Sequence, residues 1–360
     1  MNMRHLTTKR WRQNLRFLAS LQLLPALESG EETLVGGQAV LEGVMMRSPH
    51  AWGIAVRKPS GEPGKLGEIV THSEPLERPS DKHKWMGWPV VRGVMTLWYA
   101  MKLGFSALKF SANAALEEIP TGGDGKVRGN DNGSDEERGK KLEIPGWVLA
   151  VNMVFSFAFF IFMYKYLPLL ATTGLKRVNP IFGQQIVFNL VDGLIRIAIF
   201  LLFMWGISLW KDIHRVFEYH GAEHKTVFAF EHGDPLETAT VQKYSTYHPR
   251  CGTSFLMTVM IISMIVYMAI PVHTFWARFA IRIALLPLIA GVSYEIIRYA
   301  AKRFSDKRGG SLFALMTAPG LWLQRITTQP PDDSEVECAI VALDEAMKLE
   351  KHHGGELVIA

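Results

Sequence analysis

Long apolar segments constrain the fold of this chain more than any other feature. Four stretches approach the roughly 20 mostly apolar residues that a helix needs to cross a bilayer. The first holds a single charge, Lys165, near its end, whereas the second contains Asp192 and Arg196. We therefore predict a mainly α, polytopic membrane protein with about four transmembrane helices, at Trp147–Leu170, Ile186–Trp210, Ser254–Phe275 and Phe279–Ala300.

Basic residues around these segments predict the topology. Lysine and arginine cluster in the 211–253 connection, before the first span and after the fourth. We predict a multi-pass protein of the bacterial inner (plasma) membrane, with the lipid bilayer as a partner. The positive-inside rule then places both termini and this connection on the cytoplasmic side. The net charge of +5 is scattered beside apolar segments and no nucleic-acid-binding signature occurs, which argues against nucleic acid as a partner. A substrate or protein partner is expected, but the sequence does not name it.

The remaining segments complete the domain plan. Ala51–Arg57 and Leu66–His72 have the composition of short strands on either side of a turn, which predicts a β-hairpin in a small N-terminal α+β region. Val90–Ser111 is apolar but interrupted by basic residues, so we predict an interfacial or packed helix. The predicted order is a cytoplasmic or interfacial region with the hairpin (1–120), a flexible linker (121–145), two transmembrane helices (146–210), a cytoplasmic connection (211–253), two further transmembrane helices (254–303), and interfacial and amphipathic helices (304–360).

Both ends of the chain carry candidate amphipathic helices. The apolar run Phe17–Leu27 lies in a basic segment and is too short to span, so we predict an interfacial helix, with an organellar targeting peptide as the less favoured alternative. In the tail, Ser334 and Glu337 have the spacing of a capping box. Four apolar residues from Val336 to Met347 follow helical spacing, and we predict that this stripe packs on the domain.

A histidine motif follows the second predicted span. His220, Glu223 and His224 form a His-x-x-Glu-His sequence. Positions i and i+4 of a helix lie on one face, so both imidazoles can bind one metal ion. Glu223 projects near that face and could act as a general base on a water that the metal activates, as in the inverted zincin motif. We also predict that the second span continues as one helix through this motif, with the site just outside the bilayer.

A second cluster offers two further metal ligands. His248 and Cys251 stand three residues apart, directly before the third predicted span. If the second and third spans pack as an antiparallel pair, both clusters reach the same membrane surface and form one site, with zinc as the expected divalent metal. The chain has only one other cysteine, Cys338, so a disulfide framework is not expected. A thiolate is unusual in a hydrolytic centre, and a closed four-ligand site would be structural.

Other polar residues in apolar surroundings have two interpretations each. Asp192 and Arg196 could form an ion or proton path, or an ion pair that faces the bundle, and the pair is favoured. Glu295, in the cytoplasmic half of the fourth span, could approach the metal as an extra ligand. Glu42 and Arg47 lie in a glycine-bearing segment that follows no predicted strand. They could pair with each other, which is favoured, or line a substrate cleft.

Four blocks of this sequence resemble a known family. Together they span most of the chain from about Leu34 to Ala342, and they resemble the signature blocks of the domain-of-unknown-function 1385 family. The resemblance implies a bacterial or plastid membrane protein that is often labelled a metal-dependent enzyme, and it implies no established reaction. The blocks are Gly37–Arg47, Tyr219–Thr226, His248–Phe255 and Pro319–Gln324.

These patterns favour a membrane-bound, metal-dependent hydrolase that acts at the cytoplasmic membrane face on a peptide, an amide or a lipid-linked substrate. In this hypothesis His220 and His224 bind the metal, His248 and Cys251 are further candidate ligands, and Glu223 is the catalytic base. Two alternatives stay open at this point. One is a non-enzymatic membrane assembly or scaffold factor with a structural metal site. The other is a transporter that uses Asp192 and Arg196.

Overall fold

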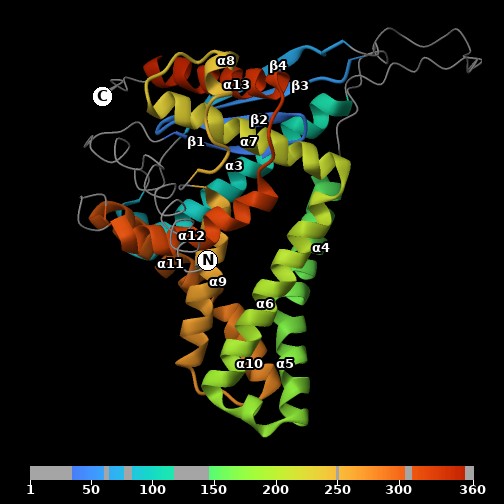
Figure 1. Cartoon of the computed structure of the whole chain (residues 1–360), viewed down its shortest axis with the longest axis vertical. Helices are drawn as coiled ribbons and strands as arrows, with labels where there is room; N and C mark the ends of the chain where they lie inside the picture. Colours follow the sequence, from blue (N-terminus) through green and yellow to red (C-terminus); the bar gives the residue numbers. More distant parts are fainter. Residues whose placement is uncertain are drawn as a thin grey trace, which may run out of the picture.

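The protein has two layers along its long axis, a cap built on a small antiparallel sheet and a bundle of apolar helices below it (Figure 1). This computed structural model describes residues 35–60, 65–76, 83–116, 146–248, 251–304 and 310–352. The mainly helical class with a small N-terminal sheet is confirmed. The predicted interfacial helix at Phe17–Leu27 and the predicted linker at 121–145 lie outside the described residues.

The sheet has four strands in the order β1-β2-β3-β4, each antiparallel to its neighbour. The predicted hairpin is confirmed as β3 and β4, although β4 begins three residues later than expected. The first hairpin, β1 and β2, was not predicted. Its two-residue turn ends on Glu42, which has a φ of 54°, and it lacks the Asn-Gly signature of such turns. The strands are β1 (Gly36–Val40), β2 (Gly43–Arg47), β3 (Ala51–Arg57) and β4 (Ile69–Pro75).

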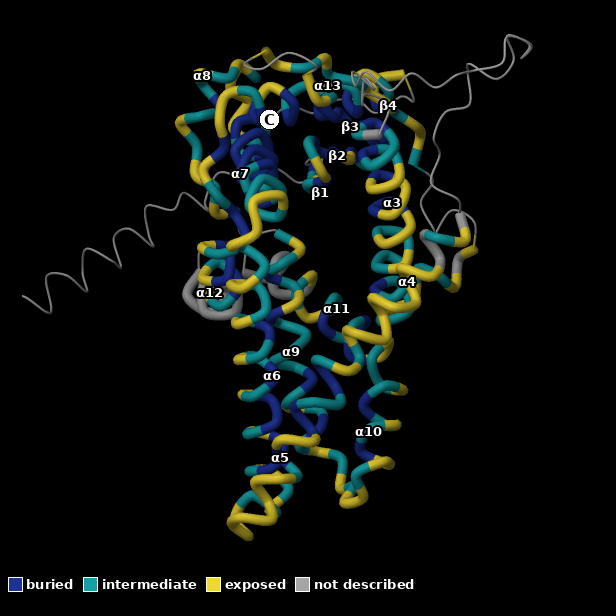
Figure 2. Tube along the Cα trace, turned by 90° about the vertical axis from the view of Figure 1, so that its right-hand side faces the viewer, coloured by how far each residue is buried: buried dark blue, intermediate teal, exposed yellow. Residues whose placement is uncertain are grey.

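Helices cover both faces of the sheet. On one face α7 (Lys211–Glu231) and α13 (Asp333–His352) pack against Val44, Met46 and Ala55. On the other face α3 (Val91–Leu116) packs against the opposite side chains of the same strands, so the predicted packed helix at Val90–Ser111 is confirmed. Figure 2 shows α7 and α3 on either side of β1. The inward residues of α7, α3 and α13 include Tyr219, Ala222, Val227, Leu103, Ala107, Val336, Leu343 and Met347.

The tail helix packs as predicted but begins differently. Asp332, not Ser334, forms the capping box, because its side chain accepts from the Glu335 backbone and the Glu335 carboxylate accepts from the Asp332 N–H. Glu337, the other predicted member, forms an ion pair with Arg57 instead. The apolar stripe of α13 is buried against the sheet.

The lower bundle is built from apolar helices that differ in length from the predicted spans. Val151–Val178, a run of α4, one π-helical turn and α5, is long and apolar enough to cross a membrane, as is α6 (Gln185–Ser208). A third span exists only if α10 and α11, which bend by 50°, count as one. Among the described residues the structure therefore has two or three candidate spans rather than four. The elements are α4 (Gly146–Ile161), the π turn (Phe162–Tyr166), α5 (Leu167–Val178), α9 (Gly252–Met268), α10 (Phe275–Ala284), α11 (Leu286–Phe304) and α12 (Gly310–Thr327). Short 3₁₀ helices lie at Lys84–Gly87 and Pro180–Gly183, and the one-turn helix α8 is at Thr238–Val241.

Prolines explain why the last two predicted spans are shorter or broken. The predicted span at Ser254–Phe275 ends as α9 at Met268, shortly before Pro271. The predicted span at Phe279–Ala300 breaks at Leu285, just before Pro287. Proline has no N–H to donate and its ring clashes with the preceding turn, so a helix ends or bends at such positions.

The predicted continuous helix from the second span into the histidine motif is interrupted. Trp210 has extended backbone angles (φ −80°, ψ 128°), and a new helix, α7, begins at Lys211. In Figure 1, α6 follows the long axis whereas α7 lies across it beneath the sheet. The break therefore moves the histidine motif out of the apolar bundle and into the cap.

Candidate metal centre

Three side chains from two elements converge at the base of the cap. His220 and His224 lie one turn apart on α7, and Cys251 is the residue that precedes α9. Their ligand atoms all lie within 4.8 Å of one another, and the Cys251 Sγ is 3.3 Å from the His220 Nε2. The structure therefore joins Cys251 of the second predicted cluster to the two histidines of the first.

Backbone carbonyls fix the orientation of both imidazoles. The His220 Nδ1 lies 2.7 Å from the Thr327 carbonyl, and the His224 Nδ1 lies 2.5 Å from the Thr246 carbonyl. A carbonyl only accepts, so each Nδ1 carries a proton, and in the neutral imidazole the lone pair is then on Nε2. Histidines that bind metals usually donate their other ring N–H to a carboxylate, a backbone carbonyl or a water. The two Nε2 atoms are therefore the ring nitrogens that could bind a metal ion.

One nitrogen of this group lacks a hydrogen-bond partner. The His224 Nε2 is buried and accepts or donates no hydrogen bond among the described residues. A buried polar atom without a partner costs about 1–3 kcal/mol. A cation bound between the two imidazoles and the Cys251 sulfur would remove that cost. Two imidazoles and a thiolate are ligands that zinc accepts in tetrahedral sites.

Glu223 lies between the histidines and the first strand of the sheet. Its Oε2 is 3.8 Å from the His220 Nε2 and 3.7 Å from the His224 Nε2, and its Oε1 accepts a hydrogen bond of 2.9 Å from the Gly37 N–H. A Cβ at Gly37 would lie 2.8 Å from the Glu223 Cγ, so only glycine permits this approach. The strand thereby holds the carboxylate beside the candidate ligands.

His248 lies beside this group but outside it. Its ring centroid is 5.7 Å from that of His224, and its Nε2 is 3.4 Å from a Glu231 carboxylate oxygen. Burial lowers the pKa of His248 to about 4, so its imidazole is neutral at pH 7. Its role as a fourth ligand stays a prediction, because its nitrogen atoms are not among the three that converge.

The sequence did not predict several residues that position the histidines. The Gln324 side chain accepts from the His248 N–H and donates to the His248 carbonyl, both at 2.8 Å. Thr246 and Thr327 orient the imidazoles through their carbonyls alone. A backbone contact leaves no residue-type signal, so only Gln324, which stands in one of the resembling blocks, could have been suspected.

A cavity of about 240 Å³ opens onto the metal-ligand group. Arg47 lines this cavity, in agreement with the prediction that it lines a cleft. The favoured prediction, a pair between Glu42 and Arg47, is wrong, because Glu42 forms a bidentate ion pair with Arg215. The cavity reaches from α7 across the first hairpin to α3. Its walls include Val35, Gly36, Gly37, Gln38, Met45, Leu103, His220, Glu223, His224, His248 and Cys251.

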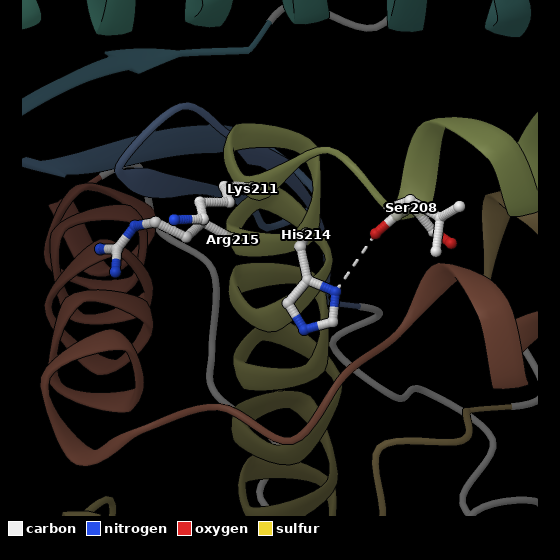
Figure 3. A pocket seen from close by; sticks show the side chains of 5 residues that line it. Ser208, Lys211, His214 and Arg215 are labelled. Carbon is white, nitrogen blue, oxygen red and sulfur yellow. Dashed lines mark hydrogen bonds between the residues drawn. The ribbon is translucent and has the colours of Figure 1, made fainter.

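A second cavity, of about 470 Å³, lies where α6 gives way to α7. Figure 3 shows Lys211, His214 and Arg215 around it, with the His214 ring directed at the Ser208 carbonyl. The His214 Nδ1 lies 3.3 Å from that oxygen. None of its lining residues belongs to the metal-ligand group, so it is a separate feature.

The buried charges of the apolar bundle form a network of their own. Asp192 pairs with Arg196, as predicted, and also with Arg282, each at 2.5 Å. Arg282 further donates a hydrogen bond of 2.9 Å to the Asn189 side chain. Glu295 does not reach the metal-ligand group as proposed from the sequence, because it pairs with Arg92 on α3.

Comparisons with known proteins give a family without a named activity. A family model described as "Protein of unknown function (DUF1385)" matches residues 88–349, which leaves the resembling block Gly37–Arg47 outside the match. The "Uncharacterized protein YqhQ" of Bacillus subtilis (strain 168) is 31% identical over 316 residues, which cover 88% of this chain and 92% of that protein. No solved structure matches the chain.

Proposed function

Because the chain belongs to the DUF1385 family, whose description names no activity, we propose its function from the site: a metal-dependent hydrolase that acts at the cytoplasmic face of a membrane. One observation carries the proposal. Two imidazoles with their Nδ1 atoms bound to carbonyls direct both Nε2 atoms at one point, next to a thiol and a carboxylate. Zinc is the proposed metal because of the nitrogen and sulfur donors.

The residues around that point divide the work. His220, His224 and Cys251 would hold the ion, which when bound supplies a Lewis acid for a substrate carbonyl. Glu223 is the proposed general base, since its Oε2 faces the ligand nitrogens while the Gly37 N–H holds its Oε1. A water beside Glu223 would lose its proton to Oε2 as it attacks. The His224 side chain is 2% exposed and that of His220 is 13% exposed, which limits the access of bulk solvent to their ring nitrogens.

Membrane placement is part of the same proposal. We place the lower bundle in a bacterial inner membrane as a multi-pass domain, with the cap and both termini in the cytoplasm. Exposed apolar side chains on Val151–Val178 and Gln185–Ser208 support insertion, because water would not stabilise so much apolar surface. The basic residues of the 211–253 connection support a cytoplasmic cap. The metal centre would then lie just above the membrane surface.

A scaffold with a structural metal is the second candidate. The observation that favours it is Cys251, because a thiolate ligand is common in closed zinc sites and uncommon in hydrolytic ones. A shift of the neighbouring His248 toward the group would close such a site. A transporter is less well supported, since Asp192 binds both Arg196 and Arg282 inside the bundle. That mutual pairing fits a structural role.

The test separates metal binding from catalysis. A strain that lacks the chromosomal gene is complemented with the wild-type chain, with Glu223→Gln, or with the matched control Glu237→Gln, which changes an exposed carboxylate away from the group. Peptides and lipids of the membranes are then compared by untargeted mass spectrometry. We expect Glu223→Gln to keep its metal but to accumulate uncleaved substrate, as does the empty strain. If the Glu223→Gln chain holds metal and also restores the wild-type profile of peptides and lipids, the hydrolase proposal fails and the metal has a structural role.

A further inference from the structure

The first strand of the sheet has an edge without a neighbouring strand beside the candidate metal centre. We infer that the substrate is an extended peptide that pairs with β1 as an added strand, which places one of its carbonyls at the metal-ligand group. This inference rests on the proposed hydrolase function and names the class of substrate for that site. The strand register, the unpaired backbone groups and the position of Glu223 support it.

β1 is an edge strand, because it pairs with β2 alone in the order β1-β2-β3-β4. Val40 and Gly43 flank the two-residue turn and therefore form a hydrogen-bonded pair. In an antiparallel ladder such pairs alternate, so Gln38 points its backbone groups at β2 whereas Gly37 and Ala39 point theirs away. The hydrogen bond from the Gly37 N–H to Glu223 confirms this alternation.

The outward backbone groups form an incomplete strand edge. Among the described residues, no partner is found for the Gly37 carbonyl or for the outward N–H and carbonyl of Ala39. Unpaired groups of this kind are a template for an additional strand, and several peptide-binding proteins use an edge in this way. Gly37 is exposed, and Gly36 carries no side chain either, so a second backbone can approach closely.

The edge and the metal-ligand group are joined by one carboxylate. Glu223 binds the outward Gly37 N–H with Oε1, and its Oε2 is within 3.8 Å of both histidine Nε2 atoms. Residues 35–38 and the metal-ligand group line the same cavity. A peptide strand paired with β1 therefore runs past Glu223 and the candidate ligands. A backbone carbonyl of that peptide is the natural electrophile at this position.

The experiment scans the peptide backbone instead of altering the protein. Purified full-length protein in detergent, loaded with zinc, is incubated with a proteome-derived peptide library, and cleavage sites are read by mass spectrometry. The peptide cleaved fastest is resynthesised with a single N-methyl group at each amide in turn. Strand pairing uses every second peptide N–H, so methylation at alternate positions should slow cleavage by about tenfold or more, the effect of losing one hydrogen bond. The intervening positions should change little.

The outcomes distinguish strand pairing with β1 from the proposed hydrolase function. Cleavage that is equally sensitive, or equally insensitive, at all positions would overturn pairing with β1 while leaving a metal peptidase. Hydrolysis of a nitrophenyl ester with no cleavage in the whole library would overturn the peptide substrate and leave a hydrolase of another class. Zinc-loaded protein that hydrolyses neither the ester nor any peptide would overturn the proposed function and the inference together.

Discussion

At the scale of single residues, backbone groups decide what the side chains of the site can do. The carbonyls of Thr246 and Thr327 set the tautomers of the two histidines, and the Gly37 N–H holds Glu223 in place. The sequence predicted His220, His224, His248 and Cys251 as ligands of one site with Glu223 beside them, because ligand types and helical spacing are visible in it. The orienting contacts were not predictable, since every residue type has a backbone carbonyl and all but proline have a backbone N–H.

Gly37 provides a stringent test of the strand contact. In Gly37→Ala the new Cβ would meet the Met45 carbonyl at 2.6 Å and the Glu223 Cγ at 2.8 Å, so the strand or the carboxylate must move. We expect a loss of about 1–3 kcal/mol in the free energy of unfolding, the usual cost of overpacking, together with lost activity. Gly36→Ala is the matched control, because its nearest neighbour would be 4.0 Å away. Chemical denaturation measures both, and equal stability of the two variants would contradict the contact.

Glu335 predicts a pH dependence of stability. Burial raises its pKa from 4.5 to about 8 in the folded protein, and its Oε1 has no hydrogen-bond partner among the described residues. The native state therefore binds more protons than the unfolded state between these values, so the free energy of unfolding falls as the pH rises from about 4.5 to about 8. Glu335→Gln should be more stable than the wild type by at least about 1 kcal/mol at pH 9, the equivalent of one pKa unit, and nearly equal at pH 4.5. Denaturation curves at both pH values that show the same difference would rule this out.

At the scale of elements, breaks and turns explain where the prediction from sequence stopped. Hydrophobic periodicity located α3, α6 and α13 because each has a long apolar face. It overestimated α9, and it merged α6 with α7, because periodicity continues across a single extended residue such as Trp210. The β1–β2 hairpin was invisible for a different reason. Its turn uses Glu42 at a positive φ that tertiary contacts with Arg215 stabilise, and no local turn signature marks it.

The buried network of the bundle predicts a graded response to mutation. Asp192→Ala leaves Arg196 and Arg282 without their carboxylate, so we expect it to cost about 3–5 kcal/mol in the free energy of unfolding. The double variants that combine Asp192→Ala with Arg196→Ala or with Arg282→Ala should each lose less free energy of unfolding than Asp192→Ala alone. The triple variant should recover most of that loss. Glu295→Ala is the control, because it breaks a more exposed pair with Arg92 and should cost about 1 kcal/mol or less. Additive losses in the double variants, measured in detergent, would exclude a coupled network.

At the scale of the whole molecule, the candidate metal-ligand group lies where the two layers meet. The sheet contributes Gly37, α7 in the cap contributes both histidines, and the apolar bundle contributes Cys251 at the start of α9. Neither layer alone contains the complete group. Unfolding of the bundle should therefore release the metal even when the cap keeps its structure. The arrangement also ties the location of the site to the membrane topology.

Cysteine labelling tests that topology. Cys251→Ser removes one native thiol, and the other, Cys338, is buried. In this background Glu237→Cys in the cap or Val178→Cys at the far end of α5 therefore provides the thiol that a reagent can reach, because both positions are exposed. A reagent that cannot cross the membrane should label Val178→Cys in intact spheroplasts and Glu237→Cys only after lysis. Labelling of both sites from the outside, or of neither, would exclude a cytoplasmic cap over a spanning bundle.

The most direct test of the account is the metal content of the purified chain. After exposure to zinc and removal of the excess, inductively coupled plasma mass spectrometry should find about one zinc per wild-type chain, as a single site with prepared nitrogen and sulfur ligands requires. His220→Ala, His224→Ala and Cys251→Ser should each lose most of it, because each removes one converging ligand atom. Glu223→Gln, a change of similar shape beside the ligands, should keep it. A wild-type chain without stoichiometric metal, or ligand variants that hold as much as the wild type, would contradict the metal centre.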